Sequence, residues 1–198
     1  MAKPYNRKDH HYNNAKEAGL RSRAFFKLEE LDQKYKIIKP HSKILDLGAW
    51  PGSWIEYCAK KLGPQGRICG IDLAEIEVFP QDSIKTITGD VFDRDLVPEV
   101  QDFLGEQCDL ILSDLSPKLT GIKDCDQAAM CSLLESVVWW AETMLKPSGV
   151  FVAKAFKGQD TDLFVKNIKK RCKKVLRAEL KSTRNTSQEF YIVGWSLT

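Results

Sequence analysis

The segment Lys43–Trp54 reads KILDLGAWPGSW and joins an apolar run to a helical pattern through a turn that contains Gly48 and Gly52. This order predicts a buried strand followed by a helix. Glycines in such a turn let a ligand approach the backbone closely. The dinucleotide fingerprint G-x-G-x-x-G is missing, so the turn favours a ligand without a pyrophosphate. A cationic amino-acid head group, reached indirectly by Asp46, is the natural candidate, and an ordinary strand–helix turn is the alternative.

Short apolar runs alternate with helical patterns along the rest of the chain. The predicted strands are 43–48, 67–73, 84–90, 109–115, 150–156, 175–181 and 189–197, and the predicted helices are 54–63, 125–146 and 160–172. Strands separated by helices indicate βαβ crossovers, a parallel sheet and helices on both of its faces. The last two strands are joined by a short loop and must therefore be antiparallel. The sequence predicts an α/β fold with a mainly parallel seven-stranded sheet.

Four aspartates follow or end four successive predicted strands, and they are Asp46, Asp72, Asp90 and Asp114. The carboxyl ends of parallel strands meet at one edge of a sheet, where ligands of α/β proteins bind. Asp72 lies 26 residues after Asp46, close to the spacing at which an acidic side chain receives the hydroxyls of a ribose. A single such aspartate is commonly a cap or turn residue. Four together favour a ligand site.

Three further charged residues are candidates for the same edge. Lys154 ends the fifth strand, and Glu189 begins the last strand, whose antiparallel direction brings its start to that edge. Lys27 lies on a predicted helix within 21–35, about 60° from the middle of an apolar stripe. That stripe consists of Ala24, Leu28, Leu31 and Tyr35. Both residues have an alternative interpretation that involves no site. Lys27 could cover apolar surface with its aliphatic stem, and Glu189 could be a solvated residue at the edge of the sheet.

The net charge of +3 is unevenly distributed. Residues 1–27 have a net charge of +5 and residues 164–184 a net charge of +8, whereas the stretch between them is acidic. Two basic ends suggest that the chain binds a polyanion, although basic helices can also be merely solvated.

Several classes of protein and site are disfavoured by composition. No apolar run approaches the ~18–20 residues of a membrane span, and the N-terminus lacks the apolar core of a secretory signal. The six cysteines form no C-x-x-C motif. We therefore expect reduced cysteines, no metal site and a cytoplasmic location.

The motifs taken together resemble the FtsJ/RrmJ-type ribose 2′-O-methyltransferases over nearly the whole chain. The matching residues are Tyr12-x-x-x-Ala15-Lys16, Arg21-Ser22-Arg23-Ala24-x-x-Lys27-Leu28, Asp46-Leu47-Gly48-x-x-Pro51-Gly52-x-Trp54, Gly89-Asp90, Ser113-Asp114-x-x-Pro117, Val152-x-Lys154-x-Phe156-x-Gly158 and Ser187-x-Glu189-x-Tyr191. The Lys-Asp-Lys-Glu tetrad of the family falls on Lys27, Asp114, Lys154 and Glu189.

The resemblance implies a cofactor, S-adenosyl-L-methionine, and a site for it. The expected cofactor contacts are Asp46, Gly48, Gly52, Trp54, Asp72, Asp90 and Asp114, with Asp72 at the ribose and Asp90 at the adenine edge. Trp50 and Ser53 depart from the family pattern, which usually has a small residue and a glycine at these positions. Lys154 is implied as the base that removes the hydroxyl proton, and the alternative is that it stays charged and only positions the hydroxyl.

The resemblance also implies the architecture and the target. We expect a Rossmann-like class I methyltransferase whose residues 1–198 form one domain, with a helical, RNA-facing segment 1–36 and a cofactor-binding core 43–198. The expected substrate is a uridine in large-subunit ribosomal RNA, bound by a monomer. The alternatives are the tRNA anticodon loop as substrate, or a non-catalytic RNA-binding factor in ribosome assembly.

Overall fold

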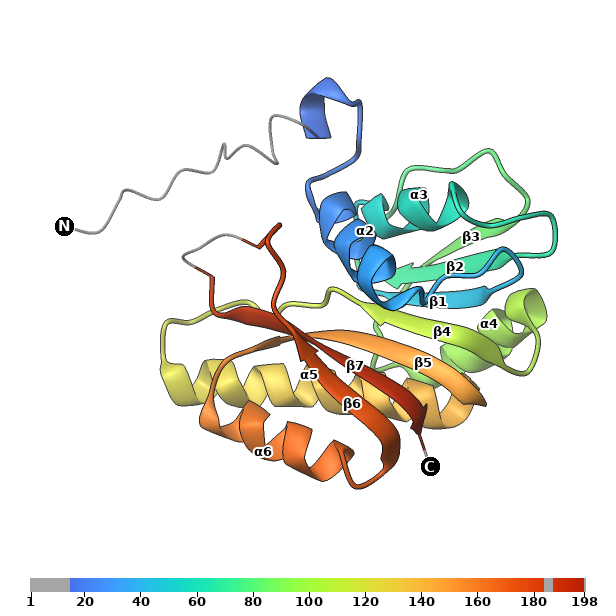
Figure 1. Cartoon of the computed structure of the whole chain (residues 1–198). Coiled ribbons are helices and arrows are strands. Elements are labelled where there is room, and N and C mark those ends of the chain that lie inside the picture. Colours follow the sequence, from blue (N-terminus) through green and yellow to red (C-terminus); the bar gives the residue numbers. More distant parts are fainter. Residues whose placement is uncertain (1–14, 184–186, 198) are drawn as a thin grey trace.

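A seven-stranded sheet forms the centre of the computed structural model, which describes residues 15–183 and 187–197 (Figure 1). The strand order is β3-β2-β1-β4-β5-β7-β6. The strands are β1 (Lys43–Leu47), β2 (Arg67–Asp72), β3 (Ile84–Thr88), β4 (Cys108–Ser113), β5 (Leu145–Phe156), β6 (Cys172–Ala178) and β7 (Glu189–Leu197). Strands β1 to β5 are parallel to one another, and β7 is antiparallel to both β5 and β6. The predicted fold class is confirmed.

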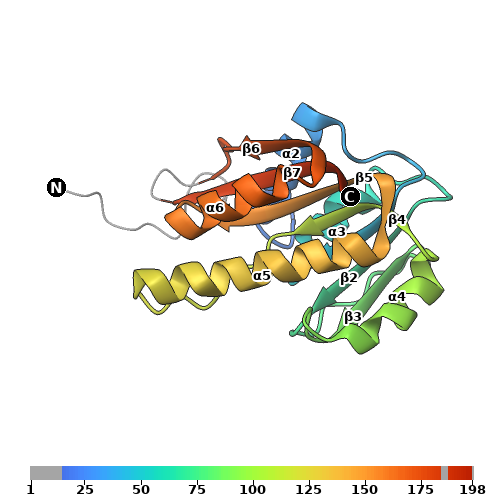
Figure 2. The same ribbon diagram turned by 90° about the horizontal axis from the view of Figure 1, so that it is seen from below.

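The helices cover both faces of the sheet (Figures 1 and 2). They are α2 (Ala24–Tyr35), α3 (Ser53–Ala59), α4 (Val97–Leu104), α5 (Lys123–Met144) and α6 (Gln159–Ile168), with a 3-10 turn η1 (Arg94–Leu96) before α4. Helices α2 and α3 pack on one face, and α4, α5 and α6 pack on the other. Consecutive strand side chains point to opposite faces, so Ile44 packs with α2 and α3 while Leu45 packs with α5. This two-sided burial explains the continuous apolar runs in the sequence.

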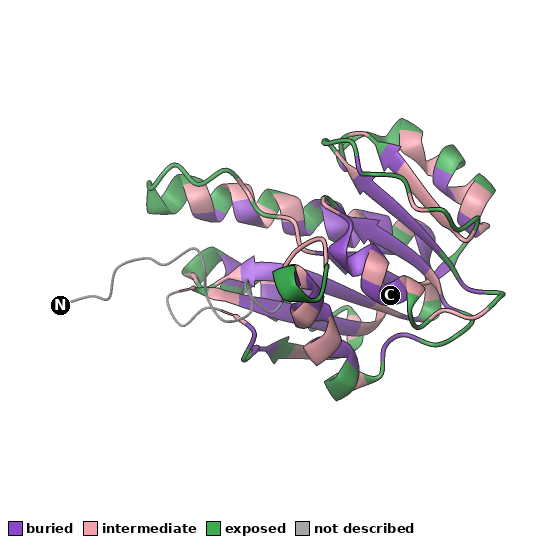
Figure 3. Cartoon of the chain, turned by 90° about the horizontal axis from the view of Figure 1, so that it is seen from above, coloured by how far each residue is buried: buried purple, intermediate pink, exposed green. Residues whose placement is uncertain are grey.

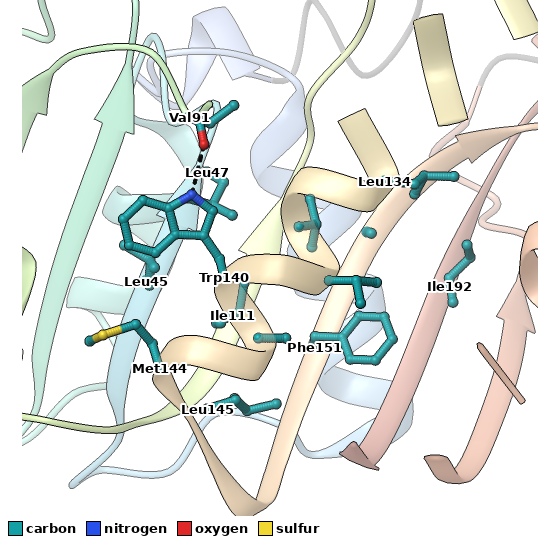
Figure 4. Packing of buried hydrophobic residues seen from close by; sticks show 14 of the residues in the cluster. Leu45, Leu47, Val91, Ile111, Leu134, Trp140, Met144, Leu145, Phe151 and Ile192 are labelled. Atoms are coloured by element: carbon teal, nitrogen blue, oxygen red, sulfur yellow. Dashed lines mark hydrogen bonds between the residues drawn. The ribbon is translucent and has the colours of Figure 1, made fainter. Parts of the chain in front are cut away.

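Helix α5 contributes the largest fully buried side chain, Trp140 (Figure 4). Its indole N–H donates to the carbonyl oxygen of Val91 over 2.8 Å, and the Ser136 hydroxyl donates to the same oxygen over 2.9 Å. These bonds hold the chain that follows β3 against α5, which fixes one wall of the site described below. Buried residues concentrate on the strands and on the helix sides that face them (Figure 3).

The structure corrects several predicted boundaries. Helix α6 ends at Ile168 rather than at 172, because Lys170 and Arg171 close a turn, and β6 then occupies 172–178 instead of 175–181. Helix α4 is absent from the sequence prediction; a proline in its first turn and two buried side chains, Val100 and Leu104, account for it. Strand β5 starts before the predicted 150, and its pairing with β4 shifts register after Cys108.

Parts of the predicted N-terminal and basic segments, residues 1–14 and Arg184, lie outside the described residues. Across the described ranges, no helix has the length and apolar character needed to span a bilayer.

Candidate active site

The carboxyl ends of the parallel strands border a cavity of about 510 Å³. It lies where the strand order reverses between β1 and β4, the place at which open α/β sheets bind ligands. Four of the predicted cofactor residues line it, and they are Gly48, Asp72, Asp90 and Asp114. Apolar side chains, among them Trp50, Leu115 and Leu133, form much of the rest of the lining. The volume suits a nucleoside-sized ligand.

Asp46 lies at the inner end of this region and has no hydrogen-bond partner for either carboxylate oxygen among the described residues. Its side chain lines a small pocket that also touches Gly48, Trp54 and Asp114. Burial raises the pKa of Asp46 well above its ordinary value, and the negative charges of Asp114 and Asp72 raise it further. A buried, unpartnered carboxylate is costly, so the pocket is suited to a cationic group or a bridging water.

Asp72 and Asp90 accept hydrogen bonds from backbone N–H groups, Asp72 from its own loop and from the loop after β1, and Asp90 from its own loop. The carboxylate of Asp72 accepts hydrogen bonds from the backbone N–H groups of Trp50, over 2.9 Å, and Ala74, over 2.9 Å. Asp90 accepts from the N–H of Phe92 over 3.0 Å. Each oxygen has a further lone pair, so both carboxylates can still accept a ligand hydroxyl or amine.

Gly52 does not line the cavity. It has a positive φ of 100°, and a Cβ there would come within 2.8 Å of the Arg21 guanidinium and 3.0 Å of the Phe79 ring. Arg21 donates to the carbonyl oxygens of Pro51 and Glu77, over 3.0 Å each, and stacks on Phe79. The structure thus packs Gly52 against Arg21 and Phe79, and Gly52 is not among the residues that line the cavity or the small pocket. The cofactor contact expected for Gly52 stays a prediction.

Trp54, Ser53 and Trp50 have different surroundings. The buried indole N–H of Trp54 donates to the carbonyl of Ala24 over 2.8 Å, which ties α3 to the start of α2. The Ser53 hydroxyl, also buried, donates to the Ser22 hydroxyl over 2.7 Å. Trp50 is 59% exposed and borders both the cavity and the small pocket. Of the two departures from the family pattern, only Trp50 reaches the large cavity.

Beside the cavity, four side chains from distant parts of the sequence form one cluster. Lys27 of α2 lies 2.8 Å, Nζ to Oε1, from Glu189 at the start of β7. The Lys27 Nζ is also 3.8 Å from Oδ1 of Asp114, which follows β4. The Nζ of Lys154 on β5 is 3.3 Å from the same Oδ1 and donates to the Asp114 backbone carbonyl over 2.5 Å. The structure therefore brings Lys27, Asp114, Lys154 and Glu189 together.

Burial and the neighbouring charges shift the pKa values of Lys154 and Asp114. Burial lowers the pKa of Lys154, and the Lys27 ammonium also lowers it, while Asp114 and Glu189 raise it; the net pKa lies below the ordinary lysine value. Burial raises the pKa of Asp114, but the ammonium groups of Lys154 and Lys27 and the Tyr191 hydroxyl lower it more. The arrangement keeps Asp114 ionised and brings Lys154 closer to losing its proton.

Tyr191 is a fifth side chain in contact with this cluster, and no role is predicted for it from the sequence. Its hydroxyl donates to Oδ1 of Asp114 over 2.6 Å, and burial, with the charges of Asp114 and Glu189, raises the pKa of Tyr191 well above its ordinary value. The signal in the sequence is the spacing of two from Glu189, which puts both side chains on one face of β7.

Three comparisons with known proteins bear on this site. A family model described as FtsJ-like methyltransferase matches residues 20–197. The chain is 41% identical to ribosomal RNA large subunit methyltransferase E of Desulfatibacillum aliphaticivorans, covering 96% of this chain and 90% of that protein. It is 37% identical to the protein of the same name from Methanothermobacter thermautotrophicus, covering 95% of this chain and 89% of that one.

Two solved structures have a similar fold. A Plasmodium falciparum protein described as a ribosomal RNA methyltransferase gives a TM-score of 0.79 at 27% identity, covering 89% of this chain and 98% of that one. Fibrillarin from Aeropyrum pernix, solved with S-adenosyl-L-methionine bound, gives a TM-score of 0.55 at 18% identity, covering 80% of this chain and 68% of that one. The second likeness concerns the fold alone.

The environment of Asp46 makes a testable prediction about stability. Its pKa is raised in the folded protein, so its carboxyl favours the folded state below the ordinary pKa of 3.8 and disfavours it as the pH rises through the folded-state pKa. We expect Asp46→Asn to increase the free energy of unfolding at pH 7 by about 1 kcal/mol, with the gain disappearing at low pH. Urea unfolding at several pH values measures this.

Asp109 provides a control of opposite sign. Although burial raises its pKa, hydrogen bonds from Lys146 and from the Lys43 backbone, with the Lys146 charge, lower it below the ordinary value. Asp109→Asn should therefore reduce stability at pH 7, and the difference should fade as the pH falls. An Asp46→Asn protein that is less stable than the parent at pH 7 would contradict our account of the Asp46 pocket.

Proposed function

The chain belongs to the FtsJ-like methyltransferase family, and on that premise we propose that it transfers a methyl group from S-adenosyl-L-methionine to a ribose 2′-hydroxyl of RNA. Large-subunit ribosomal RNA is the proposed substrate, with a uridine as the expected nucleotide. The observation that carries the proposal is the cluster of Lys27, Asp114, Lys154 and Glu189 beside the cavity. The names of the similar proteins from Desulfatibacillum and Methanothermobacter support the choice of RNA.

The residues present fit the proposed cofactor. The unpartnered carboxylate of Asp46 is complementary to the ammonium group of its methionine part. Asp72 has free lone pairs for the ribose hydroxyls, and Asp90 has them for the exocyclic amine of adenine. When bound, S-adenosyl-L-methionine supplies a methyl group activated by a positively charged sulfur.

Lys154 is proposed to act on the 2′-hydroxyl. In its neutral form the Lys154 amine has two N–H donors, and Asp114 offers them two acceptors, its backbone carbonyl and Oδ1. The nitrogen lone pair is then left for the proton of the 2′-hydroxyl. The burial that lowers the pKa of Lys154 increases the share of this neutral form. Asp114 thus orients the amine, and Lys27 disfavours its protonation.

This proposal predicts the effect of removing Lys154. Lys154→Ala should reduce single-turnover methyl transfer by a factor of ~10²–10⁴, the usual contribution of a positioned base. Lys154→Arg should be nearly as damaging, because arginine keeps its proton throughout this pH range. The assay is transfer of labelled methyl to large-subunit RNA at saturating RNA and cofactor. The exposed lysine at position 157 offers a matched control, since Lys157→Ala should transfer at close to the parental rate.

Two further measurements separate the possible outcomes. Cofactor affinity measured by calorimetry should be similar in all four proteins, and RNA with 2′-deoxyribose at the target should accept no methyl group. A Lys154→Ala protein with the parental rate would remove Lys154 from the reaction. If Lys154→Arg alone keeps the rate, the lysine acts by charge and position, and its role as a base is wrong. If the parent methylates RNA on a base instead of a ribose, the proposed reaction is wrong.

The proposed RNA-binding surface consists of the described part of the two basic segments. Some of their charge has internal partners: Arg21 holds the loop carbonyls described above, and Arg23 donates to the carbonyl of Ser182 over 3.1 Å. The lysines around the end of α6, including Lys169 and Lys173, are exposed. These exposed lysines are the better candidates for contacts to RNA phosphates.

The salt dependence of RNA binding tests this surface. Lys169→Gln and Lys173→Gln should each weaken binding and reduce the slope of log affinity against log salt by about 1. Lys85→Gln, on the far edge strand β3 where Lys85 pairs with Glu99, should leave the slope unchanged. Titration of fluorescent RNA at several salt concentrations measures these slopes. Equal slopes in all four proteins would show that Lys169 and Lys173 do not bind phosphate.

A further inference from the structure

Glu189 has a second partner that the proposed mechanism does not use. Its Oε1 accepts a hydrogen bond from the Thr183 hydroxyl over 2.9 Å, in addition to the ion pair with Lys27 Nζ over 2.8 Å. Only 11% of the Glu189 side chain is exposed. Because both donors meet one oxygen, Thr183 and Lys27 together determine where this carboxylate points.

Thr183 is itself held in place by α2. Glu30 on that helix accepts hydrogen bonds from the backbone N–H of Lys181 over 2.8 Å, from the N–H of Ser182 over 3.0 Å and from the Ser182 hydroxyl over 2.9 Å. Arg23, the residue that precedes α2, donates to the Ser182 carbonyl over 3.1 Å. Ser182 is buried, with 4% of its surface exposed. The chain just before Thr183 is thus fastened to the helix that carries Lys27.

Lys27 and Glu30 are three residues apart and lie on neighbouring positions of the α2 surface. The helix therefore makes two contacts, through Glu30 with Ser182 in the chain after β6, and through Lys27 with Glu189 at the start of β7. These contacts join residues more than 150 positions apart in the sequence. A shift of the connection relative to α2 would change the geometry of the Lys27–Glu189 pair.

We propose that Thr183 is a positioning residue for methyl transfer, which holds the Glu189 carboxylate on Lys27 while Glu30 and Ser182 fix Thr183 relative to α2. This inference rests on the function proposed above. Thr183 acts through Glu189 and need not touch substrate. With the carboxylate fixed, the Lys27 ammonium stays ion-paired with Glu189 where it approaches Asp114.

The test compares two substitutions at position 183. Thr183→Val keeps the shape and removes the hydroxyl, whereas Thr183→Ser keeps the hydroxyl. On the high-pH plateau, where Lys154 is neutral in both proteins, we expect Thr183→Val to lower kcat for methyl transfer by roughly tenfold, the scale of one hydrogen bond to a charged group. Thr183→Ser should retain most of the parental kcat. The KM for S-adenosyl-L-methionine and the thermal unfolding temperature should stay close to those of the parent.

The pH dependence of kcat distinguishes positioning from a merely structural role, which would leave it unchanged. The Lys27 ammonium lowers the pKa of Lys154 and Glu189 raises it. Freeing Glu189 leaves Lys27 less neutralised, so the rising limb of the Thr183→Val profile should move to lower pH. In a Glu189→Gln background, where the charged acceptor is gone, Thr183→Val should cost less than it does in the parent.

The outcomes separate the two proposals. A parent that does not methylate RNA contradicts the proposed function, whatever the variants do. An active parent with an equally active Thr183→Val protein overturns the positioning role. Three other results would overturn it as well. They are equal losses of kcat in Thr183→Val and Thr183→Ser, an unchanged rising limb of the pH profile, and the same loss of kcat when Thr183→Val is made in the Glu189→Gln background. Each would show that Thr183 does not act through its hydrogen bond to Glu189.

Discussion

The rest of the site depends on the contacts that the Asp114 carboxylate makes with Lys27, Lys154 and Tyr191. Its Oδ1 lies within 3.8 Å of two lysine ammonium groups and accepts a hydrogen bond from the Tyr191 hydroxyl. Without this negative charge, Lys27 would keep Glu189 as its partner, but the buried ammonium group of Lys154 would lose the carboxylate that it contacts. Asp114 also borders the cavity, so the same residue connects the lysine cluster to the proposed cofactor site.

The architecture explains how distant segments reach this carboxylate. Reversal of the strand order between β1 and β4 opens the edge at which Asp114 stands, and the antiparallel β7 returns Glu189 and Tyr191 to that edge. Helix α2 then covers one face of the sheet and inserts Lys27. Hydrogen bonds of Arg21 to the loop carbonyls and of Ser53 to Ser22 hold the segment before α2 in place. The packing of α2 on the sheet therefore also positions Lys27 in the site.

Periodicity and strand direction suffice to predict the sheet, its antiparallel strand and the common edge of the four aspartates. They do not predict hydrogen bonds between segments far apart in sequence. Gly52 illustrates the limit, because the residues that cover it, Arg21 and Phe79, come from two other segments. The hydrogen bond from Thr183 to Glu189 shows the same for the lysine cluster, because Ser182, the residue before Thr183, is held by Glu30 of the distant helix α2.

The most direct test of this account is the titration of Lys154 in the parent and in Asp114→Asn. Heteronuclear NMR of the lysine side-chain nitrogens, with Lys154→Arg to assign the signal, measures its pKa. Asp114 raises the pKa of Lys154, while burial and the Lys27 ammonium lower it. The account predicts a lower Lys154 pKa in Asp114→Asn than in the parent, with both below the ordinary lysine value of 10.5. An unchanged or higher pKa in Asp114→Asn would contradict it.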